Sequence, residues 1–389
     1  MKPLGESELA GPFRRGLSLL VRYGLLLLAF GLAACADLPS QSEAVALARP
    51  SPQRQQLVPA QSSVPAGAGL RKCIGPYHAS RVSGDFSGYV SVQQFIQRMV
   101  QQHGFDREYL NGLFSQAHRK NWTLEYFAKQ DQTLKKPPRI GGWTKYRSQF
   151  LDDAHIGAGV EFARRYRSAL QRASRQYGVP EEYILGILAV ETTFGGNVGN
   201  HRVLDALTTL GFDYQRRGDF FRDELEKFLL MARQEGIDPA KPVGSFAGAM
   251  GLGQFMPSSF LRWAVDFDQD GRRDLWDPED AIGSVANYFA KHGWRPGRPV
   301  ATPLQAKGSV ALETGVDTSY SLASLHEAGL KPARPCTGTE SVLLLLLRHS
   351  SHDQYLIGHP NFYTITRYNH STYYAMAVHE LAQTFKQRL

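Results

Sequence analysis

The sequence predicts a mainly α-helical protein (fold class α+β) that carries a small inserted β-rich subdomain. Apolar residues recur at helical spacing through most of residues 90–292, which indicates a helical core. Residues 298–366 are instead rich in Pro, Gly, Thr and Val, a composition that favours strands and turns. Helical spacing returns at the C-terminus in one apolar stripe, formed by Tyr374, Val378, Leu381 and Phe385. The length of 389 residues allows a large core and one to three domains.

The N-terminus has the layout of a secretory signal peptide. Basic residues, the last of them Arg22, precede an apolar run of about 12 residues, which is too short for a bilayer span of about 20. The run ends in Leu32-Ala-Ala-Cys35, which resembles the lipobox of bacterial lipoproteins, where the cysteine is acylated. We therefore expect a lipoprotein signal peptide over residues 1–35 with Cys35 as the lipidation site. An ordinary signal peptide with an incidental cysteine is the alternative.

The residues after Cys35 indicate where the protein is held. By resemblance to lipoproteins, Ala36 rather than Asp at this position indicates the inner leaflet of the outer membrane, so the expected location is the periplasm. Residues 36–75 are rich in Ser, Pro, Gln and Ala and lack a periodic apolar pattern, which predicts a flexible tether.

An α domain is expected over residues 76–140. Apolar residues such as Phe95 and Met99 lie one helical turn apart, and helical spacing runs from Val90 to Phe127. The segment Lys135-Lys-Pro-Pro-Arg139 breaks that spacing with two prolines, so it marks the end of this domain.

The core is expected over residues 141–297, with its C-terminal part at residues 357–389. Helical spacing extends from Trp143 to about Tyr177, and Pro180-Glu-Glu opens a further helix with Pro at its first position. The β-rich subdomain is expected between these two parts, over residues 298–356. The change of character over residues 298–366 rests on the apolar run Val342–Leu347 and, beyond the subdomain, on Tyr363–Thr366, which is also expected to be a strand.

The charge and the motif content limit the classes of partner and cofactor. The formal net charge of +8 is spread along the chain and suits an anionic partner such as cell-wall polymer or a membrane surface. No Lys/Arg-rich run is interleaved with aromatic residues, so nucleic acid is not an expected partner. The sequence lacks phosphate-loop and nucleophile-elbow motifs, and no organic cofactor is expected. Export would allow Cys73 and Cys336 to form a disulfide, while two free thiols are the open alternative.

One acidic residue, Glu191, lies on the apolar face of a predicted helix. That face holds the residues three, four and seven positions earlier, which are Leu188, Ile187 and Ile184. Gly195-Gly196 follow as stop signals, so Glu191 lies near the helix C-terminus. Burial and the negative end of the helix dipole both raise the pKa of a carboxyl group, and a protonated carboxyl can donate to a glycosidic oxygen. A structural Glu paired with an Arg is the alternative.

A glycine-rich segment downstream holds polar side chains suited to sugars. Residues 244–258 contain four glycines together with Ser245 and Gln254. Glycines let the backbone approach a ligand closely, while Ser and Gln supply neutral hydrogen bonds. Alone such a segment is usually only a turn, but beside the sequence Val-Glu-Thr-Thr-Phe-Gly at 190–195 it indicates a sugar-binding site.

Four motifs together carry a resemblance to a known family. They are Gly186-Ile-Leu-Ala-Val-Glu-Thr-Thr-Phe-Gly195, Ser245-Phe-Ala-Gly-Ala-Met-Gly251, Gln254-Phe-Met-Pro-Ser-Ser259 and Arg367-Tyr-Asn-His-Ser-Thr372. The chain resembles the lytic transglycosylases, in particular the membrane-bound lytic murein transglycosylases of type B, over roughly residues 90–300 and 355–387. The resemblance implies a lysozyme-like catalytic core with an α domain and a small β domain.

The resemblance also implies an activity, the cleavage of peptidoglycan glycan strands without water. Glu191 would protonate the β-1,4 bond between N-acetylmuramic acid and N-acetylglucosamine, and the substrate's acetamido oxygen would stabilise the oxocarbenium-like centre. It would then act as base while the muramic C6 hydroxyl closes a 1,6-anhydro ring. Hydrolysis of the lysozyme type needs a second carboxylate. The acids nearest in sequence, Asp205 and Asp213, lie outside the motifs.

Further site residues follow from the resemblance where the sequence matches. The residues implied to line the glycan groove are Tyr146, Ser245, Gln254, Tyr288, Asn369 and Tyr374. Arg216 and Arg217 are implied to face the peptide or lactyl carboxylates of the substrate. The alternatives are core aromatic residues for the tyrosines and a solvated helix start for the arginines.

Residues 266–277 match an EF-hand calcium loop in part. Asp occupies positions 1, 3, 5 and 9, and Gly271 stands at the sixth position, where the loop turns. Asp277 replaces the usual Glu at position 12 and is predicted to cap the next helix, while by resemblance Asp280 supplies the last ligand. The expected structural Ca²⁺ is held by Asp266, Asp268, Asp270, Asp280 and the backbone carbonyl of Arg272. A solvated acidic turn is the alternative.

Two hypotheses of different class follow from these features. A lytic transglycosylase leaves 1,6-anhydromuramyl ends, whereas a muramidase, its nearest enzymatic rival, leaves reducing ends. A non-catalytic lipoprotein scaffold would grip the wall and recruit peptidoglycan synthases. The acid on the apolar helix face favours an enzyme, because a binding module gains nothing from it.

Overall fold

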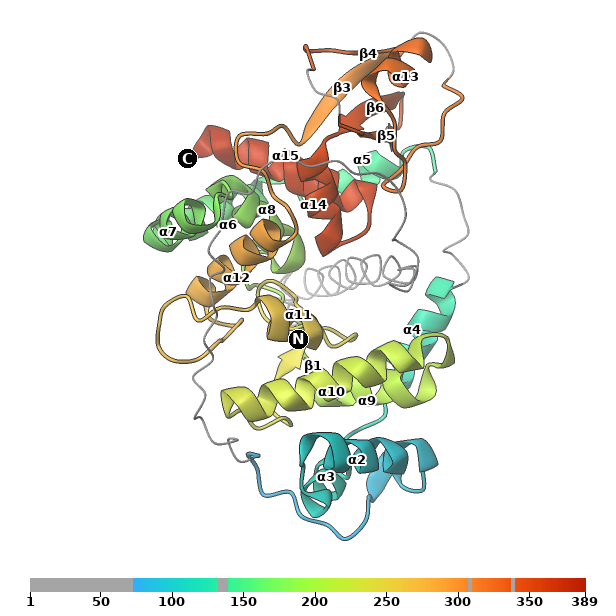
Figure 1. The fold of residues 1–389 in the computed structure, drawn as a ribbon, viewed down its shortest axis with the longest axis vertical. Coiled ribbons are helices and arrows are strands. Elements are labelled where there is room, and N and C mark those ends of the chain that lie inside the picture. Colours follow the sequence, from blue (N-terminus) through green and yellow to red (C-terminus); the bar gives the residue numbers. More distant parts are fainter. Residues whose placement is uncertain (1–72, 132–138, 307–309, 337–339) are drawn as a thin grey trace, which may run out of the picture.

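The computed structural model describes residues 73–131, 139–306, 310–336 and 340–389. The expected signal peptide, the lipidation site Cys35 and most of the tether lie outside these ranges. Within them, no helix is both long and apolar enough to cross a membrane. Helices dominate the fold and one small region holds most of the strand residues, which confirms the predicted fold class (Figure 1).

Three helices form the N-terminal part of the described chain. After a 3-10 turn, η2 (Gly84–Phe86), come α2 (Val90–His103), α3 (Arg107–Phe114) and α4 (Asn121–Asp131). The predicted helical spacing is thus divided among three helices. Gly104 ends α2 in the left-handed conformation (φ 64°), and Asp106 begins α3 by accepting the N–H of Tyr109 at 2.7 Å.

The middle of the chain is a set of helices around α8 (Glu181–Thr192). Its other elements are α5 (Gly142–Arg147), α6 (Asp153–Arg165), α7 (Arg167–Tyr177), α9 (Val203–Asp213), η3 (Gln215–Arg217), α10 (Gly218–Glu235), α11 (Pro257–Trp263) and α12 (Pro278–Lys291). Two short strands, β1 (His201–Arg202) and β2 (Val243–Gly244), pair antiparallel. Pro180 is the N-cap of α8 and not its first residue, because its ψ of 141° is extended.

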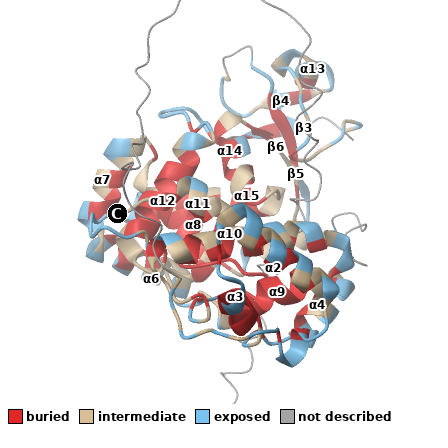
Figure 2. Ribbon diagram, turned by 60° about the horizontal axis from the view of Figure 1, so that its bottom comes forward, coloured by how far each residue is buried: buried red, intermediate tan, exposed pale blue. Residues whose placement is uncertain are grey.

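Helix α8 is buried on every side rather than on one face. All of its residues from Tyr183 to Val190 are buried, and Figure 2 shows burial concentrated in the central helices, α8 and α12 among them. Gly186 lies against α15 (Thr372–Arg388), since a Cβ there would stand 2.8 Å from the carbonyl oxygen of Val378. The missing side chain therefore lets α8 and α15 pack closely.

The β-rich region holds a four-stranded antiparallel sheet of order β4-β3-β6-β5. Its elements are β3 (Ala301–Ala306), α13 (Leu322–Glu327), β4 (Leu330–Pro332), β5 (Leu343–Arg348) and β6 (Asp353–Gly358). The run Val342–Leu347 is a strand as predicted, but the prediction of a strand at Tyr363–Thr366 is wrong. Those residues lie in α14 (Pro360–Tyr368), which starts with Pro at its first position and buries Ile365 and its two threonine neighbours.

The sheet packs on different residues on its two faces. Leu343, Leu345 and Leu347 of β5 join the main core, whereas Leu344 and Ile357 belong to a separate small cluster beneath α13 and β4. The alternation follows from the two-residue period of a strand. Cys73 and Cys336, whose pairing the sequence left open, are both free thiols in the structure.

Candidate active site

Glu191 lies in the last turn of α8, where the buried helix reaches the surface of the core. Its side chain is partly accessible to solvent. The helix ends immediately afterwards, since Thr193 and Phe194 adopt left-handed φ angles of 50° and 60°. The stop is therefore two residues earlier than the glycine signal predicted. Left-handed backbone is costly for residues with a Cβ, so strain is concentrated directly after the acidic residue.

The pKa of Glu191 is far from its ordinary value. Burial raises it from 4.5 to about 7, and one hydrogen bond opposes that rise. The hydroxyl of Tyr374, at the start of α15, donates to Oε1 of Glu191 at 2.5 Å. None of the charged groups that the structure describes contributes to the shift. Glu191 thus exchanges its proton near neutral pH, as a general acid must.

Three tyrosine side chains lie near Glu191, of which Tyr374 is buried and Tyr146 and Tyr368 are partly buried. Burial and the nearby charge of Glu191 raise the pKa of Tyr146, Tyr368 and Tyr374, so all three hydroxyls are neutral at physiological pH. The rings of Tyr368 and Tyr374 stack with centroids 6.5 Å apart. Tyr368 also donates to the carbonyl of Gly253 at 2.5 Å, which joins α14 to the glycine-rich segment.

Thr192 ties the end of α8 to the glycine-rich segment. Its hydroxyl donates to the carbonyl of Leu252 at 2.9 Å and accepts the N–H of Gly195 at 3.0 Å. The predicted groove residue Ser245 is only 1% exposed, and its oxygen accepts the N–H of Ala249 at 3.0 Å. In this structure Ser245 therefore holds the segment in its folded shape.

Two predicted groove residues present buried acceptors without a partner in the described part of the chain. These are Oε1 of Gln254 and Oδ1 of Asn369. The amide nitrogen of Gln254 donates to the carbonyl of Gly251 at 2.8 Å, which fixes the side chain. A buried acceptor without a donor costs about 1–3 kcal/mol, so both groups are suited to a hydrogen-bonding ligand. Tyr288, also predicted, packs against Tyr368 at 4.8 Å.

The two predicted arginines make their contacts with α4 and α10. Arg216 forms an ion pair with Asp131, the last residue of α4. The guanidinium of Arg217 lies 4.3 Å above the ring of Phe220.

Neither of the two acids that follow Glu191 in sequence is a free carboxylate. Asp205 is paired with Arg202 at 2.7 Å and with Lys120 at 3.0 Å. Asp213 is paired with Arg119 at 2.7 Å. Both are therefore committed to structural ion pairs.

The acidic loop before α12 gathers three carboxylates. Asp266, Asp268 and Asp280 each offer an oxygen, and these atoms all lie within 4.8 Å of one another. Oδ1 of Asp266 is buried without a hydrogen-bond partner in the described chain. Asp270 is not part of this group, and its Oδ1 accepts the N–H of Arg272 at 2.8 Å. An all-oxygen donor set with an orphaned buried oxygen fits a hard cation such as Ca²⁺.

The end of the acidic loop follows the predicted pattern. Asp277 caps α12, as expected, by accepting the N–H groups of Glu279 and Asp280. Asp280 accepts the N–H groups of Phe267 at 2.6 Å and Asp274 at 2.7 Å. These bonds close the loop on the first turn of α12.

Sequence reasoning missed Thr192 and Tyr368 as site residues. Thr192 immediately follows Glu191, and Tyr368 lies inside the motif Arg367–Thr372. Both residues lie in motifs that the sequence analysis had identified. Their hydrogen bonds, from Thr192 to Leu252 and from Tyr368 to Gly253, join residues far apart along the chain, so the sequence could not predict them.

Comparison with known proteins gives matches along most of the chain. A family model described as a transglycosylase SLT domain matches residues 88–383. The membrane-bound lytic murein transglycosylase B of Escherichia coli K12 is 49% identical over 327 residues, which are 83% of this chain and 89% of that protein.

Solved structures agree with that match. The Escherichia coli lytic transglycosylase Slt35 in complex with calcium has a TM-score of 0.75 and 48% identity, covering 79% of this chain and 96% of that one. SltB3 from Pseudomonas aeruginosa, in complex with NAG-anhNAM-pentapeptide, has a TM-score of 0.63 and 27% identity, covering 76% of this chain and 79% of that one. The chain therefore belongs to the lytic murein transglycosylases, peptidoglycan-cleaving enzymes with a lysozyme-like fold.

Proposed function

We propose that Glu191 is the only acid/base residue of the reaction, which cleaves the β-1,4 bond between N-acetylmuramic acid and N-acetylglucosamine. The observation that carries the proposal is a carboxyl of pKa about 7 among neutral tyrosine hydroxyls. Protonated Glu191 donates to the glycosidic oxygen as the C1–O bond breaks. The resulting carboxylate then takes the proton of the muramic C6 hydroxyl, whose oxygen bonds to C1 and closes the 1,6-anhydro ring.

This sequence of steps consumes no water and returns the proton to Glu191. The substrate's acetamido oxygen stabilises the oxocarbenium-like centre, a task that a second carboxylate performs in many glycosidases. The pairing of Asp205 and Asp213 with cations supports a reaction without such a residue. The anhydromuramyl ligand of the SltB3 relative supports the expected product.

The glycan groove is proposed to be lined by Tyr146, Ser245, Gln254, Tyr288, Asn369 and Tyr374. The unpaired oxygens of Gln254 and Asn369 would accept hydrogen bonds from sugar hydroxyl or acetamido N–H groups. Arg216 and Arg217 would bind peptide or lactyl carboxylates, and such a carboxylate would share Arg216 with Asp131.

Product analysis of digested sacculi tests this proposal. We expect muropeptides with 1,6-anhydromuramyl ends, and a rate lower by about 10²–10⁴-fold for Glu191→Gln, as for loss of a general acid. Glu182→Gln, on the first turn of the same helix, is the matched control and should retain activity. Reducing ends that carry ¹⁸O from labelled water would identify a muramidase instead.

A structural Ca²⁺ in the loop 266–280 is also proposed, held by Asp266, Asp268, Asp270, Asp280 and the carbonyl of Arg272. The orphaned oxygen of Asp266 and the calcium complex of the Slt35 relative support it. Titration calorimetry after chelation should show Ca²⁺ binding and a higher Tm, both weakened in Asp266→Asn. No heat and no change in Tm would refute the site.

The final proposal concerns location. We propose that Cys35 is acylated and holds the enzyme on the periplasmic side of the outer membrane, where peptidoglycan synthases are its protein partners. The membrane-bound relative from Escherichia coli supports an anchored enzyme. Cys35→Ala should move the protein from the outer-membrane fraction to the soluble periplasm. Crosslinking in cells tests whether peptidoglycan synthases contact the enzyme.

A further inference from the structure

An aromatic cluster lies at the start of α4, outside the proposed groove residues. Trp122 is 44% exposed although it is one of the largest apolar side chains. Its ring stacks with Tyr126 at 5.3 Å and with His201 at 6.0 Å, and it lies perpendicular to the ring of Phe246 at 5.7 Å. We name these four residues the Trp122 platform. The rings of Tyr126, His201 and Phe246 thus pack against the partly exposed indole of Trp122.

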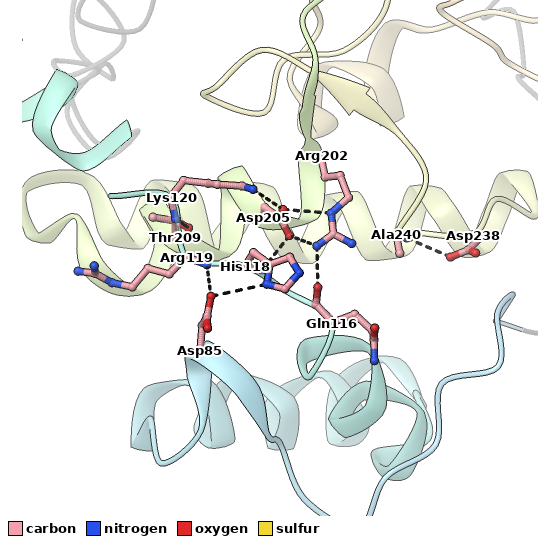
Figure 3. Close-up of polar contacts among 10 residues, drawn as sticks. All are labelled: Asp85, Gln116, His118, Arg119, Lys120, Arg202, Asp205, Thr209, Asp238 and Ala240. Carbon is pink, nitrogen blue, oxygen red and sulfur yellow. Dashed lines mark hydrogen bonds and ion pairs between the residues drawn. The ribbon is translucent and has the colours of Figure 1, made fainter. Parts of the chain in front are cut away.

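One buried carboxylate, Asp205, joins the two chain segments that carry Trp122 and His201. Figure 3 shows Lys120 and Arg202 converging on Asp205 from different segments. Lys120 stands two residues before Trp122, and Arg202 directly follows His201. The N–H of Lys120 also donates to Thr209 at 3.0 Å. The two stacked rings are therefore held by the same ion-pair network.

The platform is linked to the region around Glu191 through the glycine-rich segment 244–258. Phe246 directly follows Ser245 in that segment, and the carbonyl of Leu252, six residues further on, accepts a hydrogen bond from the hydroxyl of Thr192. On the other side, Tyr126 and Gln130 follow Trp122 at four-residue steps along one face of α4. That face spans about 12 Å at 1.5 Å per residue and ends beside Asp131, the partner of Arg216.

The chemistry of the platform suits a sugar ring. The exposed part of the Trp122 indole is apolar and electron-rich, and such an aromatic surface packs against the C–H face of a pyranose. Burial lowers the pKa of His201, so this ring is neutral at physiological pH and adds no charge to the stack. A neutral ring surface favours an uncharged acetylated hexosamine over an anion or a metal.

We propose that the Trp122 platform is a distal sugar-binding subsite that stacks an N-acetylhexosamine of the glycan strand several residues from the cleaved bond. The inference rests on the proposed function of Glu191, since it extends the same groove. It assigns to Trp122 a role in binding long strands and none in bond cleavage.

Strand length is the variable that tests the subsite. In the Glu191→Gln background, binding of N-acetylglucosamine trimers and hexamers is measured by calorimetry. Trp122→Ala should weaken hexamer binding by about tenfold, the upper range for one aromatic contact, and leave trimer binding unchanged. Trp122→Phe should recover most of the loss. Tyr363→Ala removes another exposed aromatic, on α14, and should change neither ligand.

The outcomes separate this inference from the proposed function. Equal weakening of trimer and hexamer, or no change with either, would overturn the subsite. With Glu191 restored, Trp122→Ala should lower kcat/KM on long strands while the anhydromuramyl product is kept. Reducing ends from the wild type would refute the proposed reaction and leave the length dependence of binding intact.

Discussion

Two carboxylates that lie among packed helices, Asp205 and Glu191, have opposite surroundings. Asp205 is 0% exposed and accepts from Arg202, Lys120 and the N–H of His118, at 2.7, 3.0 and 2.9 Å. Glu191 is partly exposed and has one neutral donor, Tyr374. Both lie among packed apolar helices, yet only Asp205 has cations to balance its charge.

The difference shows that the partners of a carboxyl group, and not its burial alone, decide whether it pairs with a cation or exchanges a proton. Paired with cations, Asp205 holds segments 116–120 and 201–205 against each other. Without a cation, Glu191 keeps its proton to about pH 7 and is available for proton transfer. A carboxyl group therefore forms structural ion pairs at Asp205 and is available for proton transfer at Glu191.

The largest effect on stability is expected at Asp205. Asp205→Asn leaves Arg202 and Lys120 without their buried counter-charge and should lower the free energy of unfolding by about 3–5 kcal/mol. Urea denaturation measures the change. Asp85→Asn is the control, because Asp85 is exposed and its loss should cost less than about 1 kcal/mol. Equal losses in the free energy of unfolding for the two variants would contradict a special structural role of Asp205 compared with a surface acid.

A smaller effect of opposite sign is expected at Glu191. Its folded pKa is raised above the unfolded value, so between pH 4.5 and about 7 the folded state binds more protons, and stability falls as pH rises. Glu191→Gln resembles the protonated form at every pH, so its stability does not fall as pH rises through this range. It should be more stable than the wild type by up to about 3 kcal/mol above pH 7, at 1.36 kcal/mol per pKa unit. Thermal melts at pH 4 and pH 8 measure the gap, and a gap of the same size at both would contradict the shifted pKa.

The smallest effect concerns the single donor to Glu191. Tyr374→Phe removes the hydrogen bond that lowers the pKa of Glu191, so that pKa rises by about one to two units. The protonated form of Glu191 then persists to higher pH, and the alkaline limb of the kcat/KM profile shifts to higher pH. Tyr373→Phe, whose ring packs on Trp143 and Tyr146, should leave that limb in place. A shift of the limb to lower pH in Tyr374→Phe would contradict the conclusion that the Tyr374 hydrogen bond lowers the pKa of Glu191.

Local sequence patterns predicted the fold class, the helical position of Glu191 and the cap at Asp277, because each depends on neighbours within one or two turns. They could not predict the bond between Tyr374 and Glu191, which spans 183 residues. The error at Tyr363–Thr366 has a related cause. β-branched residues favour strands in isolation, but the core that buries Thr364, Ile365 and Thr366 favours the helix begun at Pro360.

The small sheet enters and leaves the main body through adjacent residues. Ala301 pairs with Gly358 across the ladder, and the N–H of His359 donates to the carbonyl of Val300 at 2.9 Å. The chain therefore passes between the sheet and the main body at two points that lie side by side. Leu343, Leu345 and Leu347 of β5 are shared with the main core, so any replacement of the sheet would have to keep matching apolar side chains on that strand. The chain path alone would accept a different insert here, whereas side-chain packing would limit which inserts fit.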